Sequence, residues 1–309
     1  MARPLRLEFA GAVYHLTARG DRQEAIFLSD ADRRTFLELF AKEVAQQDWI
    51  CYAYCLMDNH YHLLIETPHP NLVAGMRRLN GVYTQAFNFR RKKPGHVFQG
   101  RYKSILVEKN SYAQELCRYI VLNPVRAKLV QSPEQWSWSS FLATAGLVKE
   151  PSWLATDEVL AWFSGSRTQY RNFVMEGIGK DSVWGDLKGQ IYLGGEHFLE
   201  RMQERAAGKA SPGIATVQTQ PARPEMEEIK RAVAAKYRIR PADVLDRRQG
   251  EAYRVAVYLM RRAANLPLRQ VAIAAGVSAG RVSQIQTEIE AGKHSARLSA
   301  LLSMYKLKA

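Results

Sequence analysis

The sequence predicts an α+β protein in which helices cover an antiparallel sheet, followed by a smaller all-α domain with a helix-turn-helix. Two patterns indicate this fold class. In the first half of the chain, apolar residues alternate with the period of a strand in some segments and repeat with the period of a helix in others. Beyond a small, polar, Pro-containing stretch, only the helical period continues. Strands interleaved with helices fit a sheet covered by helices.

The expected order in the first half is strand, helix, two strands, helix, strand, helix. In the first strand, Val13, His15 and Thr17 are expected on one face. The strands are expected at residues 11–19, 50–57, 61–66 and 97–107. The helices are expected at 30–47 behind the cap Ser29, at 71–91, and from a capping box at Ser111 and Gln114 through Leu116, Ile120 and Leu122.

The net charge of +14 is the first functional indication, because an excess of positive charge attracts polyanions such as nucleic acid or an anionic membrane. Residues 1–150 contain 20 Lys/Arg and 14 Asp/Glu, residues 151–220 contain 7 and 8, and residues 221–309 contain 17 and 8. Two basic ends therefore flank a neutral middle, which suggests two contacts with one polyanion. Charge alone would fit a merely soluble basic protein equally well.

The cysteines and the N-terminal segment indicate a reducing cytoplasm. The three cysteines, Cys51, Cys55 and Cys117, are odd in number and include no CxxC pair, so neither a disulfide framework nor a thiolate zinc site is expected. No apolar run of membrane-spanning length and no signal peptide are recognised in the sequence. We expect a cytoplasmic, nucleoid-associated protein without a membrane partner.

His60 and His62 form the first candidate site. Residues i and i+2 of a strand face the same side, so both imidazoles would project together and could hold a divalent ion. Tyr61, Leu63 and Ile65 would fill the opposite, buried face, and the histidine face is expected to be exposed. Taken alone, an HxH pair is more often two ordinary surface or packed histidines.

Tyr119 and Asn123 form the second candidate pair. They are four residues apart on an expected helix, so both could point at one spot, although Pro124 would kink or end that helix. A tyrosine hydroxyl is a weak nucleophile at its ordinary pKa of about 10, and a metal that polarises a phosphate makes its attack feasible. With 14 tyrosines in the chain, a tyrosine chosen without further pattern is more often a packed aromatic.

The motifs DNHYHLL, GHVFQGRYKS and YIVLNPVRAKLV, followed by WSWSS, occur in this order. In them the chain resembles the REP-associated tyrosine transposases, the single-tyrosine branch of the HUH nucleases. The resemblance covers about the first half of the chain, and the string LGGEHF at residues 193–198 extends it. It implies the HUH nuclease fold, which is ferredoxin- or RRM-like.

The resemblance also implies a role for each matching residue. His60 and His62 correspond to paired ligands of Mg or Mn, and Asn123 falls where such enzymes place a third, amide-bearing ligand. Tyr119 corresponds to the nucleophile, which would attack a phosphate of single-stranded DNA, form a 5′-phosphotyrosine link and release a 3′-hydroxyl. The implied activity is a single-strand endonuclease and strand transferase acting on hairpin-forming repeat DNA.

Basic residues around an aromatic ring favour the same kind of partner, because phosphate contact plus a stacking ring suits a single-stranded or hairpin ligand. For each of them a solvated charged surface is an equal alternative. The candidates are Arg77, Arg78, Arg90, Arg91, Lys92, Lys93, Arg101, Tyr102 and Lys103.

The C-terminal sequence LPLRQVAIAAGVSAGRVSQIQTEIE predicts a helix, a turn at Gly276 and a second helix. Ser278 would cap the second helix, leaving Arg281, Ser283 and Gln284 near its N-terminal half, where recognition helices touch bases. This segment resembles the duplex-binding domains of the replication initiator and Trp repressor type. A plain helical packing module is the alternative, and the basic balance favours DNA binding.

Four segments are expected: a catalytic domain at 1–150, an aromatic-rich helical extension at 151–204, a linker at 205–224 and the helix-turn-helix domain at 225–309. Two rival functions are a non-catalytic DNA-binding regulator with an inactive nuclease fold and a replication or mobilisation nickase of another HUH branch. The presence of all four candidate site residues favours an active enzyme. The YIVLNPVRA string and the lack of a following P-loop in the sequence argue against the other branch.

Overall fold

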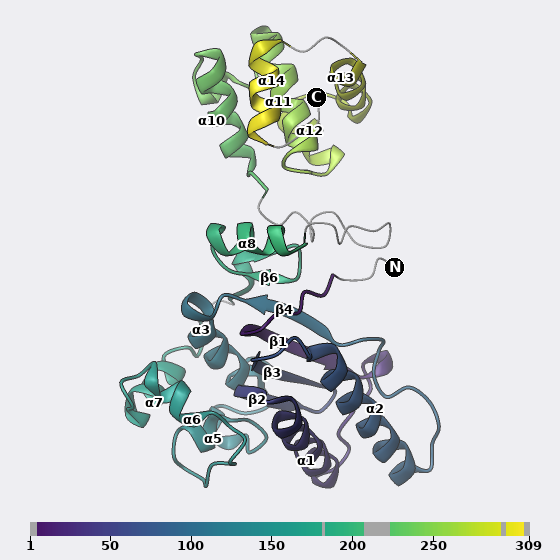
Figure 1. The fold of residues 1–309 in the computed structure, drawn as a ribbon, viewed down its shortest axis with the longest axis vertical. Coiled ribbons are helices and arrows are strands. Elements are labelled where there is room, and N and C mark those ends of the chain that lie inside the picture. Colours follow the sequence, from purple (N-terminus) through teal and green to yellow (C-terminus); the bar gives the residue numbers. More distant parts are fainter. Residues whose placement is uncertain (1–4, 181–182, 207–222, 292–294, 306–309) are drawn as a thin grey trace. The chain divides into compact units, whose positions relative to one another are not determined.

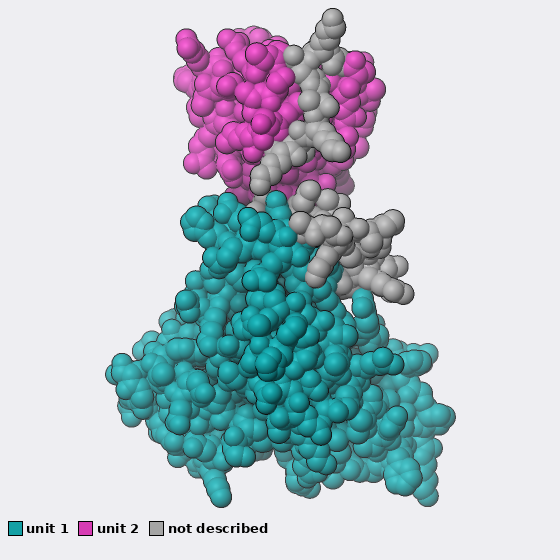
Figure 2. Space-filling view, in the orientation of Figure 1, with its two compact units in different colours: residues 1–221 teal, residues 222–309 magenta. Residues whose placement is uncertain are grey.

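A computed structural model describes residues 5–180, 183–206, 223–291 and 295–305. The chain divides into two compact units, residues 1–221 and 222–309, which Figure 2 colours separately. Most of the linker expected at 205–224 lies outside the described residues. Its first two residues belong to a helix of the first unit.

The first unit contains the interleaved strands and helices that the sequence predicts (Figure 1). In chain order its elements are β1 (Ala12–Arg19), η1 (Asp21–Gln23), α1 (Asp30–Gln47), β2 (Ile50–Met57), β3 (His60–Thr67), α2 (Leu72–Arg91), β4 (Lys103–Val107), α3 (Lys109–Val121), α4 (Asn123–Arg126), η2 (Pro133–Gln135), α5 (Phe141–Thr144), α6 (Thr156–Ala161), α7 (Arg167–Met175), η3 (Val183–Asp186), β5 (Leu187–Lys188), β6 (Tyr192–Leu193) and α8 (Glu196–Ala206).

The sheet has the order β2-β3-β1-β4-β6-β5. β3 pairs antiparallel with β2 on one side and with β1 on the other, and β1 pairs antiparallel with β4. This four-stranded part with its helices is the expected α+β arrangement. The expectation of a wholly antiparallel sheet is wrong at one place, because the short β6 pairs parallel with β4. The chain reaches β6 through the helices after β4, and such a crossover permits parallel pairing.

The two faces of the sheet are covered by different helices. α1 and α2 pack against each other, and on their side Tyr61 contacts Phe36 of α1 and donates a hydrogen bond to Asn80 of α2. α3 packs on the opposite face, where Val13 and Leu64 join its apolar side chains in one core. Since side chains alternate along a strand, His62 faces the α3 side.

The helix cap expected at Ser29 is confirmed, and two other expected element starts are wrong. Ser29 caps α1 by accepting a hydrogen bond from the backbone of Asp32, and α1 has the predicted bounds. The strand expected at 97–107 is confined to β4, because Val97 and Phe98 are buried in a loop against the end of β1, where Phe98 bridges to Gly20. The capping box at Ser111 is also wrong: α3 begins at Lys109, so both of its residues lie inside the helix.

The segment expected as a helical extension shares the core of the first unit. Phe163, Tyr170 and Val174 from this segment belong to the same apolar cluster as α3, and Leu193 joins it from β6. The segment thus adds β5 and β6 to the sheet, and its helices pack with α3 on one face of that sheet. Within the described ranges, no helix combines the length and apolar character needed to cross a bilayer.

The second unit is all-α, as expected, and is built around α11, which contributes the longest run of buried side chains. Its elements are α10 (Met226–Tyr237), η4 (Pro241–Asp243), η5 (Arg247–Gln249), α11 (Glu251–Arg262), α12 (Leu268–Ala274), α13 (Ala279–Ala291) and α14 (Ala296–Met304). Gly276 has a φ of 63°, the left-handed conformation that suits glycine, in the turn between α12 and α13. The predicted helix, turn and helix are therefore present.

Candidate active site

The hairpin of β2 and β3 places His60 and His62 on one side of β3, as the HxH spacing predicts. Their ring centroids are 5.0 Å apart. The expectation that both lie on an exposed face is wrong, because His62 is only 7% exposed. Helix α3 and the segment that includes Trp184 cover this face, and His60 at the strand end is half-buried.

His62 has a buried partner on the neighbouring strand, His15 of β1. Nε2 of His15 lies 2.9 Å from Nδ1 of His62, and the two rings are nearly parallel at 5°. On the other side, the ring of Trp184 stacks on His15 with the centroids 5.2 Å apart. Three rings from β1, β3 and η3 thus form one packed group.

Burial keeps these histidines neutral. Desolvation lowers the pKa of His15 to about 3, and desolvation together with the neighbouring histidines places the pKa of His62 well below its ordinary value. His60 has its pKa lowered to about 4, first by burial and then by the positive charge of Arg19. Neutral imidazole is the form that binds a metal ion.

Tyr119 lies in the last turn of α3, facing the histidines. Its ring is edge-on to His62, with the centroids 6.2 Å apart, and edge-on to Trp184 at 5.0 Å. The guanidinium of Arg126 in α4 lies 5.2 Å from the centre of the same ring. The structure therefore brings the predicted nucleophile and the predicted metal-binding pair together at the junction of α3 and β3.

Asn123 begins α4, directly after the end of α3 that Pro124 was expected to produce. Its side-chain amide donates hydrogen bonds to the carbonyl oxygens of Tyr119 and Ile120, at 2.9 and 3.2 Å. These bonds satisfy carbonyl groups at the helix end. The two hydrogen bonds hold the Asn123 amide group beside the backbone of Tyr119. Both bonds use the amide nitrogen, and neither uses the side-chain oxygen.

One nitrogen of the histidine pair has the environment expected of a ligand to a divalent ion. Nε2 of His62 is buried and has no hydrogen-bond partner among the described residues, and a buried polar atom without a partner is uncommon. Within the same part of the chain, no three His, Cys, Asp or Glu side chains are grouped so that they could hold a metal ion. A site here would therefore use the two histidines and an amide oxygen.

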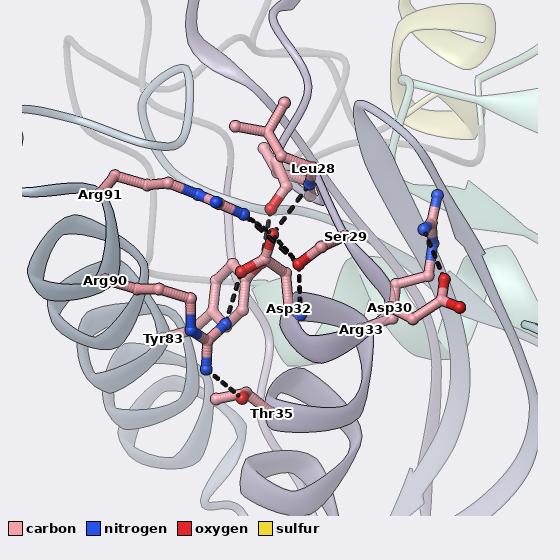
Figure 3. Close-up of polar contacts among 10 residues, drawn as sticks. Leu28, Ser29, Asp30, Asp32, Arg33, Thr35, Tyr83, Arg90 and Arg91 are labelled. Atoms are coloured by element: carbon pink, nitrogen blue, oxygen red, sulfur yellow. Dashed lines mark hydrogen bonds and ion pairs between the residues drawn. The ribbon is translucent and has the colours of Figure 1, made fainter.

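The basic residues expected to touch DNA divide into two groups. Arg90 and Arg91 of α2 both bond to the buried carboxylate of Asp32 (Figure 3), and Arg90 also donates to Thr35. Arg78 similarly pairs with the buried Glu43. These three arginines bind α2 to α1. Arg77, Lys92, Lys93, Arg101 and Lys103 are exposed and make no such ion pair within the described residues.

Tyr102 does not offer a free stacking ring. It is 7% exposed, and the guanidinium of Arg6 lies 3.9 Å from the centre of its ring. The alternation Arg101, Tyr102, Lys103 predicted the two exposed charges correctly, but Tyr102, directly before β4, is buried. The exposed aromatic ring of this region is Phe89, which is 89% exposed next to Arg90.

In the second unit, Ser278 accepts a hydrogen bond from the backbone of Arg281, which confirms the predicted cap of α13. Arg281, Ser283 and Gln284 lie in the first half of that helix, as expected, and all three are exposed. Arg281 also forms an ion pair with Glu288 at 3.1 Å. The predicted base-contacting residues thus lie at the surface, and one of them has an internal partner.

Sequence reasoning missed His15 and Trp184 as members of the site. The alternation of β1 had placed His15 on one face with Val13 and Thr17, but the partner strand was unknown. Thr17 pairs with His62 across the two strands, which puts His15 one diagonal step away. No local signal marks Trp184, which lies 65 positions after Tyr119.

Residues 9–123 match the model of the family described as "Transposase IS200 like". Among solved structures, the chain is similar to a REP-associated tyrosine transposase bound to a REP hairpin, with 17% identity, a TM-score of 0.43, and coverage of 50% of this chain and 92% of that one. It is also similar to a candidate transposase from Deinococcus radiodurans R1, with 18% identity, a TM-score of 0.28, and coverage of 38% and 95%.

A comparison with curated proteins finds no match. The matched family segment begins in the loop before β1, runs through the histidine pair of β3 and ends at Asn123. It includes all four residues of the predicted site. Residues 9–123, less than half of the chain, are therefore similar to transposases of the IS200-like family.

Proposed function

We propose that this chain is a metal-dependent single-strand DNA endonuclease and strand transferase that cleaves hairpin-forming repeat DNA through Tyr119. The observation that supports this most directly is the position of the Tyr119 ring against His62, whose Nε2 is buried without a hydrogen-bond partner in the described residues. A nucleophile and a ligand nitrogen from two different elements converge at this one place. The motif order of the REP-associated tyrosine transposases supports the choice of substrate.

In the proposed reaction, the phenolic oxygen of Tyr119 attacks a phosphate of the single strand. The new bond joins that oxygen to phosphorus, the bond from phosphorus to the 3′-oxygen breaks, and the 3′-oxygen leaves as a hydroxyl. The phenol loses one proton and the leaving oxygen gains one, so the protons balance. One phosphodiester replaces another, which keeps the link reactive for rejoining to a second 3′-hydroxyl.

His60, His62 and the side-chain oxygen of Asn123 would hold Mg or Mn. A bound divalent ion polarises the phosphate and neutralises its developing charge. The chain's own groups orient the nucleophile: Trp184 and Arg126 hold the tyrosine ring on two sides, and the Asn123 amide fixes the backbone that carries it. Exposed Arg77, Lys92, Lys93, Arg101 and Lys103 would contact the DNA backbone.

The experiment is to incubate the full chain with a single-stranded repeat hairpin in Mn or Mg and to look for a denaturation-resistant protein–DNA adduct. His60→Ala should remove the adduct, and EDTA should do the same. An adduct that forms equally in EDTA would refute the metal-dependent proposal. His69→Ala, at an exposed histidine in the loop after β3, serves as the matched control and should leave the adduct unchanged.

A second function, duplex binding by the C-terminal unit, is supported by the exposed first half of α13 behind its Ser278 cap. Helix N-terminal residues at this position are those that read bases in helix-turn-helix domains. In a nuclease this unit would add a second DNA contact. If the first unit had no nuclease activity, duplex binding by the second unit would make the chain a DNA-binding regulator.

A further inference from the structure

We infer that His15 is a positioning residue, whose ring holds the His62 imidazole so that Nε2 of His62 is the nitrogen presented to the metal. This inference rests on the proposed function. The contact is specific: Nε2 of His15 lies 2.9 Å from Nδ1 of His62, with the ring planes at 5°. Both side chains are buried, at 2% and 7% exposed. A single buried hydrogen bond therefore fixes the plane of the His62 ring.

The hydrogen bond also couples the proton positions of the two rings, because one ring must donate and the other accept. A neutral imidazole has one N–H and one lone pair. If Nδ1 of His62 donates to Nε2 of His15, the lone pair of His62 Nε2 is available to a cation. Nδ1 of His15 then holds a proton, and in the reverse arrangement Nε2 of His62 would hold one; both atoms are buried without a partner in the described residues. Only the first arrangement leaves a lone pair on His62 Nε2. Cation binding therefore requires His15 to be the acceptor.

Metal-binding histidines usually donate their second ring nitrogen to a carboxylate, a backbone carbonyl or water. Here the acceptor is another imidazole, contributed by the neighbouring strand. The register of β1 and β3 explains why His15 can reach His62. Thr17 is directly opposite His62, and His15 is the diagonal neighbour on the same face of the sheet.

Trp184 connects this group to the nucleophile. Its ring stacks on His15 at 5.2 Å and meets the edge of the Tyr119 ring at 5.0 Å. The same indole thus limits the movement of both rings. The group His62, His15, Trp184 and Tyr119 is a closed ring of contacts, since His62 and Tyr119 also meet.

The test measures Mn²⁺ affinity of the full chain by titration calorimetry without DNA. His15→Phe keeps a ring but removes the acceptor, and we expect binding to weaken about 10- to 100-fold. His15→Gln can place its carbonyl oxygen near the position of Nε2 and should restore most of the affinity. Tyr14→Phe is the matched control, because it removes one buried hydrogen bond, to the Leu7 carbonyl, from the same strand on its other face.

Wild-type affinity in His15→Phe would overturn the inference. If His15→Phe does not fold, His15→Asn replaces it, because the shorter side chain of asparagine does not reach the position of Nε2. Equal Mn²⁺ affinities of His15→Asn and His15→Gln would then overturn the inference. Failure of the proposed function gives a different result. Wild-type protein that binds Mn²⁺ with the predicted His15 dependence but forms no DNA adduct would refute the nuclease and leave the positioning role standing.

We also propose, from an independent observation, that Phe89 with Lys92 and Lys93 is a stacking site for an unpaired base of single-stranded DNA. Phe89 is 89% exposed in the last turn of α2, whose buried stripe is formed by Leu72, Met76, Leu79 and Tyr83. The ring lies outside that stripe. An aromatic ring beside cations is the usual composition of a single-strand contact.

The residues around Phe89 leave net positive charge at the surface. Asp32 neutralises one charge of the pair Arg90 and Arg91, on the α1 side of the helix (Figure 3). Lys92 ends the helix in the left-handed conformation, with a φ of 53°. The Asn88 amide donates to the Gly95 carbonyl at 2.8 Å, which closes the loop containing the two lysines. A base stacked on Phe89 would have its phosphates near these cations.

The test compares binding of a hairpin with an unpaired flank and of a blunt duplex, measured without metal so that cleavage plays no part. Phe89→Ala should weaken binding to the flanked hairpin about tenfold, and Phe89→Trp should retain it. Val82→Ala, at another exposed apolar position of α2, is the control. Unchanged binding in Phe89→Ala, or an equal loss on the blunt duplex, would overturn this proposal, whereas loss of cleavage alone would bear on the proposed nuclease.

Discussion

The ring of Tyr119 lies edge-on to the ring of His62, with the centroids 6.2 Å apart and the planes at 82°. The two residues come from α3 and β3, so their separation depends on how that helix packs on the sheet. The packing is fixed by a core in which Cys117 and Ile120 of α3 belong to the same apolar cluster as Leu64 of β3. The fold thus places the proposed nucleophile over the strand that contains His60 and His62.

The two histidines of the pair should respond differently to alanine. His62→Ala removes a buried ring and leaves Nε2 of His15 without its partner, so we expect a loss of unfolding free energy of about 2 kcal/mol. His60→Ala removes a half-buried ring at the strand end and should cost less than about 1 kcal/mol. Both should abolish Mn²⁺ binding. Thermal unfolding in EDTA separates the two effects, and equal melting temperatures would contradict the buried position of His62.

Asp32 should be a principal link between α1 and α2. It is fully buried and accepts hydrogen bonds from Arg90, Arg91 and the backbone of Leu28. Asp32→Asn keeps the shape but removes the charge, and we expect a cost of about 1–3 kcal/mol in urea unfolding. Asp30→Asn is the control on the same helix, since Asp30 is exposed and its pair with Arg33 spans 3.5 Å. Equal costs for the two variants would refute this role.

Asp32 also predicts an acid dependence. Burial by itself would raise its pKa, but the hydrogen bonds from Arg90, Ser29 and Arg91 outweigh burial and hold the pKa below the ordinary value. The folded-state pKa is thus depressed, so the stabilisation is complete above the unfolded-state pKa of about 3.9 and is lost as pH falls through the folded-state value. In Asp32→Asn this part of the acid dependence should be missing when stability is measured from pH 6 downward.

Two glycines of the C-terminal unit should respond in opposite directions to alanine. Gly276 has a φ of 63° and open space around a new Cβ, so Gly276→Ala should cost about 1 kcal/mol through backbone strain alone. Gly280 lies in α13, where a Cβ would meet just the Ser278 hydroxyl at 3.9 Å, and Gly280→Ala should stabilise by about 0.5 kcal/mol. Chemical unfolding of residues 222–309 measures both. Two changes of the same sign would contradict the assigned turn.

Removing residues 222–309 should separate the two DNA contacts. The deleted unit has its own apolar core around α11, so the remaining unit should fold and still nick a single-stranded hairpin. Duplex affinity should fall, and the slope of log affinity against log salt should shrink by about 0.9 for each phosphate that the shortened protein no longer neutralises. An unchanged slope would show that the C-terminal unit is a packing module. Loss of nicking would show that the two units act as one.

Much of the site was predictable from sequence because its members lie in short motifs. The spacing of His60 and His62 on a strand and the position of Tyr119 on a helix were both confirmed, and so was the end of that helix before Pro124. His15 and Trp184 were not predictable in the same way, because each meets the site across a distance that only the strand register and the later chain determine.

The wrong predictions of exposure have a common physical cause: segments distant in the sequence bury these side chains, and a local sequence pattern does not show this. Alternation placed Tyr102 between two exposed cations correctly, but Arg6 from the N-terminal segment lies over its ring. His62 was expected on an exposed face, but α3 and Trp184 cover it. Arg90 and Arg91 are basic residues at a helix end, and only the burial of Asp32 explains their inward direction.

The most direct measurement is identification of the covalent adduct by peptide mass spectrometry after reaction of the full chain with a single-stranded repeat hairpin in Mn. The account predicts one nucleotide-bearing peptide, modified at Tyr119 and formed through a 5′-phosphate. Tyr119→Phe should lack it while binding the hairpin and unfolding as the wild type does, because only the hydroxyl is removed and the ring contacts remain. An adduct on another tyrosine, such as Tyr112 or Tyr102, or an undiminished adduct in Tyr119→Phe, would contradict the account.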